Sequence, residues 1–274
     1  MRFHRPSQWP AARTVFAAAL IAVCGCFEAL ADLASLDDPT TAEEMETLVE
    51  DYSRRLAADP KQAKLYVQRG NAYFRLRDFD LAVEDFDAAL RLDANLDEAY
   101  FGRGMALGRG GELDRAVADL SIYLQRHPQS SLAYTKRGIR YLWMGDIENA
   151  EKDLTQALTL DPKNAEAHDD LGVIRAQRGE YAAAIKHFTA TITLDPSYQK
   201  AYHNLAMVYY LTNREQRALT VVDDGLKLSP DNRNSLLLKA EILASLGRHK
   251  EAKAVREHAE FQPEGGSSER MAIR

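Results

Sequence analysis

Small and apolar residues recur along this chain at a constant interval of 34 residues. Each unit begins with a mostly aromatic position, followed four residues later by a small residue and twelve residues after that by an alanine. The first set is Tyr66, Tyr100, Tyr134, His168, Tyr202 and Leu236. The small residues are Gly70, Gly104, Gly138, Gly172, Ala206 and Ala240. The alanines are Ala82, Ala116, Ala150, Ala184, Ala218 and Ala252. Six copies in one phase predict a solenoid of stacked supersecondary units.

Each unit predicts two helices, which we call A and B. In the first unit we expect helix A over about 64–76 and helix B over about 80–92. The turn between them needs a residue that tolerates a left-handed backbone. That position holds Gly or Asn in every copy except the first, which has Arg77. A proline follows helix B in most copies and prevents the helix from continuing: Pro128, Pro162, Pro196 and Pro230.

The small residue of helix A and the alanine of helix B predict a close approach of the two helices, because a larger side chain would force them apart. Larger apolar residues fill the gaps between units, among them Phe79, Phe86, Leu120, Leu154 and Phe188. The full pattern of Tyr, Gly, Ala, Phe and Pro resembles the tetratricopeptide repeat family over residues 63–260.

This resemblance implies an all-α fold, a right-handed superhelical solenoid of antiparallel helix pairs. The repeats would span 63–96, 97–130, 131–164, 165–198, 199–232 and 233–260. It also implies a function, because a solenoid offers a long concave surface to a peptide or protein partner rather than a pocket for chemistry.

The residues that flank the repeats predict the ends of the solenoid. Within an N-terminal segment, 32–62, residues 41–58 predict one more helix B, and Thr41 with Glu44 has the spacing of a capping box. This helix would cover the exposed face of the first repeat.

At the other end, Arg256 and Glu260 stand where the first repeat has Phe86 and Leu90, as expected for a terminal helix with water on its outer side. Residues 261–274 are rich in Gly and Ser and predict a disordered tail.

Residues 1–31, which precede the N-terminal segment 32–62, have the organisation of a secretory signal peptide. They have a basic start, an apolar run over Thr14–Phe27, and Ala29 and Ala31 before the predicted cleavage site. The apolar run is shorter than the ~20 residues that span a bilayer, which favours cleavage over a permanent anchor. Cys26 ends a loose match to a bacterial lipobox, so lipidation at Cys26, with attachment to the membrane, is the alternative. A third possibility is a cytosolic adaptor that keeps the segment.

The net charge and the absence of catalytic motifs favour a protein-binding function over nucleic-acid binding or catalysis. Removal of residues 1–31 leaves 32 basic and 40 acidic residues, a net charge near −8, which argues against nucleic acid as the main partner. Both cysteines lie in the removed segment, and the chain has no catalytic, cofactor or metal motif. We therefore expect a non-enzymatic scaffold, in the periplasm of a bacterial cell envelope if the signal is cleaved. An enzyme would need a further domain.

Two positions vary together among the repeats. Arginine precedes the small residue of helix A in the first three copies, and in each of them an aspartate stands at one fixed position of helix B. These residues are Arg69, Arg103 and Arg137 with Asp85, Asp119 and Asp153. In the later copies both are replaced, for example by Leu205 and Val221. The pattern favours ion pairs between helices over the alternative, a basic ladder that faces a ligand.

The family resemblance assigns the second, fifth, sixth, ninth, twelfth and thirteenth positions of each repeat to the concave surface. Candidate partner-binding residues at these positions are Lys64, Asn71, Phe74, Phe101, Met105, Lys136, Trp143, His203, Asn204 and Tyr210. Aromatic and methionine side chains are typical of protein interfaces, although the largest of them are also suited to packing between helices. The asparagines and lysines suit a peptide backbone or its terminal carboxylate. The family's carboxylate clamp is not reproduced, because Val67 stands in place of its lysine.

The fourth repeat departs from the pattern. His168 and Arg175 occupy aromatic or apolar positions, and Asp169 and Asp170 follow the histidine. Such breaks occur where function or strain is located. The alternatives are a variant tolerated at the surface or a local ion network.

Overall fold

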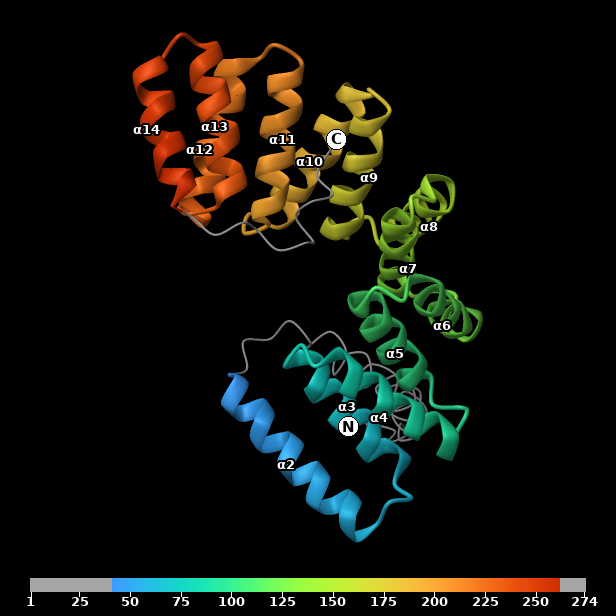
Figure 1. Ribbon diagram of the computed structural model, residues 1–274. Coiled ribbons are helices and arrows are strands. Elements are labelled where there is room, and N and C mark those ends of the chain that lie inside the picture. Colours follow the sequence, from blue (N-terminus) through green and yellow to red (C-terminus); the bar gives the residue numbers. More distant parts are fainter. Residues whose placement is uncertain (1–40, 262–274) are drawn as a thin grey trace, which may run out of the picture. The chain divides into compact units, whose positions relative to one another are not determined.

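The computed structural model describes residues 41–261, and Figure 1 shows their helices. The predicted signal peptide, Cys26 and most of the predicted tail lie outside the described residues. Within the described residues the structure has thirteen helices and no strand, which confirms the all-α prediction. The helices fall into two compact units that divide after Gly111.

The first unit contains one helix before the repeats and three repeat helices, each packed on the next. Their bounds are α2 (Ala42–Ala58), α3 (Ala63–Arg75), α4 (Phe79–Leu92) and α5 (Asp97–Gly110). The predicted capping box is present: the Glu44 N–H donates to Thr41 Oγ1 at 3.2 Å, and the Thr41 N–H donates to Glu44 Oε2 at 2.9 Å.

The helix α2 has the register of a helix B. Arg69 of α3 donates to Ser53 of α2 at 3.0 Å, and Arg103 of α5 donates to Asp87 of α4 at 2.5 Å. In both cases the acceptor precedes the arginine by the same number of positions. Ser53 is also 34 residues before Asp87, so the repeat period extends into α2.

The second unit contains nine helices in the described residues, and consecutive helices pack together along the chain. Their bounds are α6 (Leu113–Arg126), α7 (Ser131–Met144), α8 (Ile147–Leu160), α9 (Ala165–Gln177), α10 (Tyr181–Leu194), α11 (Gln199–Leu211), α12 (Glu215–Leu228), α13 (Arg233–Ser245) and α14 (His249–Glu260). In the last helix Arg256 and Glu260 are exposed, as expected for a terminal helix.

The small residues have the packing role that the pattern predicts. A Cβ added at Gly172 of α9 would lie 2.6 Å from the ring of Phe188 on α10, and one added at Gly138 would lie 3.0 Å from Leu154. The first distance is too short for two carbon atoms, and the second requires Leu154 to shift, so a side chain at either position would disturb the packing of helix A on helix B.

The turn after helix A is left-handed even where the sequence lacks glycine. Gly145 and Gly179 have φ of +79° and +75°, and the exception in the sequence, Arg77, adopts +67°. The local conformation is therefore set by the geometry of the helix pair, and Arg77 adopts it despite its side chain. In residues 41–261, no helix is long and apolar enough to cross a membrane.

Candidate functional site

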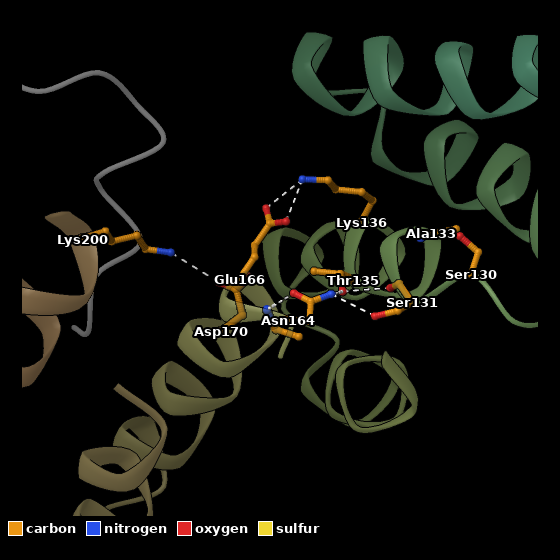
Figure 2. Close-up of polar contacts among 10 residues, drawn as sticks. Ser130, Ser131, Ala133, Thr135, Lys136, Asn164, Glu166, Asp170 and Lys200 are labelled. Atoms are coloured by element: carbon orange, nitrogen blue, oxygen red, sulfur yellow. Dashed lines mark hydrogen bonds and ion pairs between the residues drawn. The ribbon is translucent and has the colours of Figure 1, made fainter. Parts of the chain in front are cut away.

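The A helices of the second unit, α7, α9, α11 and α13, contact one another in sequence, and we call the surface they form the A-helix face. Lys136 of α7 reaches Glu166 of α9, with Nζ 2.7 Å from Oε2 and 2.9 Å from Oε1. Figure 2 shows this pair beside a second link from α9 to the next A helix, between Asp170 and Lys200. Ion pairs therefore cross the A-helix face from repeat to repeat.

Local capping fixes the start of α9 and with it the position of its acidic side chains. Asn164 accepts a hydrogen bond from the Ala167 N–H at 3.0 Å, which satisfies one of the free N–H groups of the first turn. Its amide group also donates to Ser131 and Thr135 of α7 (Figure 2). One side chain thus begins α9 and ties it to the neighbouring A helix.

Two adjacent carboxylates of α9 lie almost completely buried, with Asp169 0% and Asp170 6% exposed. Lys200 of α11 faces both: its Nζ lies 2.9 Å from Asp169 Oδ2 and 3.3 Å from Asp170 Oδ1. Burial raises the pKa of Asp170 to about 6, because the neighbouring Asp169 adds to the effect and Lys200 only partly offsets it. Burial alone would lower the pKa of Lys200, but the two carboxylates raise it above its ordinary value.

Asn204 of α11 completes this cluster. It is 1% exposed, and its Nδ2 donates to Asp169 Oδ1 at 3.1 Å. Its buried Oδ1 has no hydrogen-bond partner among the described residues. A buried acceptor without a donor is costly, so the cluster carries an unmet hydrogen-bonding demand.

The next link along the face is uncharged. His203 Nδ1 lies 3.3 Å from Ser235 Oγ on α13, and Gln199 donates to the same oxygen at 3.2 Å. Burial lowers the pKa of His203 to about 4, so this imidazole is neutral at pH 7.

A pocket opens on the A-helix face next to the carboxylates. We call it the Trp143 pocket, and its lining is Leu142, Trp143, Ile147, Asp170, Val173, Gln177 and Lys200. Arg140 of α7 is buried, with its guanidinium carbon 4.7 Å from the centroid of the Trp143 ring. The pocket therefore joins an aromatic and aliphatic wall to a carboxylate and an ammonium group, a composition typical of sites that orient a ligand by a few polar contacts.

Four of the ten predicted partner-binding residues lie on the A-helix face, namely Lys136, Trp143, His203 and Asn204. A fifth, Tyr210 of α11, is half-buried against the core of the last repeats. These five residues belong to the second unit.

The other five predicted residues belong to the first unit. Lys64 is exposed. Phe74 packs against Phe79 with ring centroids 5.6 Å apart. Phe101 and Met105 are buried, so in this structure they present little open surface. Asn71 has a buried Oδ1 without a hydrogen-bond partner among the described residues.

Three acidic residues of the site, Glu166, Asp169 and Asp170, are absent from the ten predicted partner-binding residues. They occupy the second, fifth and sixth positions of the fourth repeat, which the family resemblance assigns to the binding surface. The sequence pattern singled out Asp169 and Asp170 only as part of the irregular fourth repeat, although their repeat positions already pointed to the binding surface.

The predicted arginine–aspartate ion pairs form in the first and third repeats. Arg69 Nη2 lies 2.7 Å from Asp85 Oδ1, and Arg137 Nε lies 2.7 Å from Asp153 Oδ2. Arg103 of the second repeat pairs with Asp87, which lies outside the predicted set of aspartates. Since each of these guanidinium groups is held by a carboxylate, the structure does not support a basic ladder that faces a ligand.

In the fourth repeat a different polar contact occupies the place of that ion pair. Leu171 and His187 replace the arginine and the aspartate, and His187 Nδ1 lies 3.0 Å from His168 Nδ1. Because the carbonyl of Pro162 can only accept, the His168 Nε2 beside it carries the proton. His168 Nδ1 is then the acceptor, and His187 Nδ1–H donates to it.

Arg175 belongs to a local ion network, one of the two alternatives for this repeat. It pairs with Glu151 and with Glu180, and Arg178 pairs with Glu151 as well. Neither this network nor the histidine pair has the composition of a metal centre: residues 41–261 contain no group of three or more His, Cys, Asp or Glu side chains that could hold an ion.

Comparisons with known proteins agree with the helix pairs. The family model of the tetratricopeptide repeat matches residues 67–131 and 135–199, and a second model of the same description matches 175–233. The chain therefore belongs to the tetratricopeptide repeat family. Curated protein sequences give no match.

Solved structures of the same fold are similar to this chain at low identity. A chain of the APC/C hetero-tetramer Cut9-Hcn1 has a TM-score of 0.75 at 18% identity, covering 88% of this chain and 47% of that one. This chain thus spans about half the length of that relative. A tetratricopeptide repeat protein from Parabacteroides merdae has a TM-score of 0.67 at 18% identity, with 89% and 97% covered. YrrB, described as a TPR protein with an unusual peptide-binding site, has a TM-score of 0.52 at 21% identity, with 69% and 97% covered. These likenesses show the fold alone.

Proposed function

We propose that this chain is a non-enzymatic scaffold that binds an extended peptide or a protein segment on the A-helix face of its second unit. The observation that carries the proposal is the Trp143 pocket, which places a half-buried tryptophan beside Asp170 and Lys200. Large aromatic side chains in partly desolvated pockets commonly supply most of the binding free energy of an interface. Membership of a family of repeat proteins with extended binding surfaces supports the same function.

The recurrence of polar contacts along the A-helix face favours an extended partner over a compact small molecule. Polar contacts recur at successive A helices, first Lys136 with Glu166, then Asp170 with Lys200, then His203 with Ser235. A partner that lies across several repeats can meet one such link in each. The similarity to YrrB, whose description names a peptide-binding site, is consistent with this proposal.

A photo-crosslinking amino acid tests the location of the binding surface. Gln177 is exposed and lines the pocket, so the crosslinker at this position is expected to form an adduct with a partner in cells. Lys186, which is exposed on α10, is the matched control position. Adducts from position 186 and none from position 177 would contradict the proposal.

We also propose that the chain acts in the bacterial cell envelope, on the basis of the signal-like residues 1–31. Mass spectrometry of the mature N-terminus distinguishes the alternatives. A chain that begins at Asp32 indicates a soluble exported protein, and one that begins at a lipidated Cys26 indicates an anchored one. A retained Met1 would contradict export and favour a cytosolic adaptor.

A further inference from the structure

Beside the Trp143 pocket two carboxylates share one ammonium group. Asp169 and Asp170 are almost completely buried, and one ammonium group, that of Lys200, faces both. The nearest ion pair on the same face, Lys136 with Glu166, is balanced within itself. Buried charges are costly unless they are paired, so a second cation at the carboxylates would relieve an existing penalty.

Asp170, the carboxylate that lines the pocket, retains hydrogen-bonding capacity. Within the described residues Asp170 receives one hydrogen bond, from Lys200 to Oδ1, although an ionised carboxylate accepts several. The buried Oδ1 of Asn204, which has no donor among the described residues, adds a further acceptor behind Asp169.

The pocket walls suit a long basic side chain. Leu142, Trp143 and Val173 supply apolar surface next to the carboxylate, and the aliphatic stem of a lysine or arginine packs well against such surface while its charged end reaches the carboxylate. The side chain of Lys200 is 46% exposed, so it can turn toward solvent when another cation enters.

We propose that the Trp143 pocket binds a lysine or arginine side chain of the partner segment, which donates hydrogen bonds to Asp170. This inference rests on the proposed function and specifies the chemistry of its partner. The opposite ligand, an acidic side chain or a C-terminal carboxylate held by Lys200, would bring a third negative charge next to Asp169 and Asp170, whereas the buried cation Arg140 lies against the Trp143 ring. Charge complementarity therefore favours the cation.

The ionisation of Asp170, together with its place in the pocket lining, gives the proposal a pH dependence. Burial raises the pKa of Asp170 to about 6, the negative charges of Asp169 and Glu166 add to this effect, and Lys200 partly offsets it. The phenol of Tyr198, whose own pKa is raised by burial, also lies within electrostatic range of the cluster. A bound cation stabilises the ionised form of Asp170. Binding of a basic segment should consequently weaken as the pH falls from 7.5 to 5, since protonation of Asp170 removes the charge that attracts it.

A random library of displayed peptides, selected on the full chain, tests the proposal. We expect the selected peptides to share a lysine or arginine, and their binding to decrease when Trp143 is replaced by alanine. Selected peptides that depend on Trp143 but share an acidic residue or a free C-terminus would overturn the inference and leave the proposed function intact. Failure to select any peptide that depends on Trp143 would contradict both.

A double-mutant cycle then locates the cation. Asp170→Asn should weaken a selected basic peptide by about thirtyfold or more, as expected when a buried charge pair loses one partner. It should have little effect on the same peptide with glutamine in place of its basic residue, since the interaction is then already absent. Glu148→Gln, at an exposed position near the pocket, is the matched control. If Asp170→Asn weakens both peptides equally, Asp170 does not contact the basic side chain. A loss of stability in the variant would not change this conclusion, because both peptides are measured on the same protein.

Discussion

Arg137 of α7 donates two hydrogen bonds to Asp153 of α8, at 2.7 and 2.9 Å, and a third to Ser121 of α6, at 2.9 Å. One guanidinium group therefore joins the helix B of the preceding repeat to both helices of its own. Arg69 makes the equivalent contacts with Asp85 and Ser53. This bridge explains why the arginine and the aspartate occur together among the repeats: either residue alone would leave a buried charge without its partner.

Arg137→Leu should destabilise the protein by about 3–5 kcal/mol, because it leaves Asp153 buried and unpaired. The double variant Arg137→Leu with Asp153→Val reproduces the fifth repeat, which has Leu205 and Val221 at these positions. It should recover most of the lost stability, as measured by urea unfolding. If the double variant is as unstable as the single one, the unpaired carboxylate is not the cause.

Asp170→Asn should stabilise the protein without a partner at pH 7.5. The pKa of Asp170 is raised to about 6 in the folded state, so the folded protein binds this proton more tightly than the unfolded chain does. The associated stabilisation is present at low pH and is lost as the pH rises through about 6.

The gain in melting temperature from Asp170→Asn should therefore be largest at pH 7.5 and decrease toward pH 4. A gain at pH 7.5 together with weaker peptide binding would indicate a residue kept for binding at the expense of stability. A loss of stability at pH 7.5 would contradict this interpretation.

His187→Val should reduce the sensitivity of the fold to mild acid. Burial lowers the pKa of His187, and the neighbouring His168 and Arg175 lower it further. The folded state then binds this proton less tightly than the unfolded chain, so stability is lost as the pH falls through about 6.5, the ordinary value for histidine. Valine is the residue at the equivalent position of the fifth repeat, Val221. Melting curves between pH 7.5 and 5.5 should show a smaller decrease for this variant than for wild type or for His249→Gln at an exposed site. Equal decreases for all three proteins would exclude His187 as the source.

The helical repeat was predictable because it depends on residues that act locally and recur. Gly145 permits the left-handed turn, Pro128 prevents continuation of a helix, and Gly172 allows the close approach of Phe188. Each of these effects depends on a residue type at a fixed position, and six copies reinforce one another.

The candidate site was only partly predictable, because its contacts join residues about 30 positions apart. The register placed Asp170 on the binding surface, but its burial and its contact with Lys200 depend on how two repeats pack. Arg103 illustrates the same point. The sequence pattern pointed to an aspartate that follows it, Asp119, and the structure shows an ion pair with Asp87, which precedes it on α4.

Capture of a partner by the Trp143→Ala variant tests most directly whether the A-helix face is the binding surface. The probe is a peptide selected on the wild-type chain or the protein that crosslinks through position 177. We expect the variant to lose about 2 kcal/mol or more of binding free energy, with its helicity and melting temperature nearly unchanged. The control variant is Met144→Ala, at the adjacent residue of α7, which is 41% exposed and does not line the pocket. It should bind as wild type does.

A Trp143→Ala variant that melts at a lower temperature while its folded fraction still binds fully would contradict the account. Trp143 would then be a packing residue, and the binding surface would lie elsewhere, with the irregular fourth repeat around His168 and Arg175 as the next candidate.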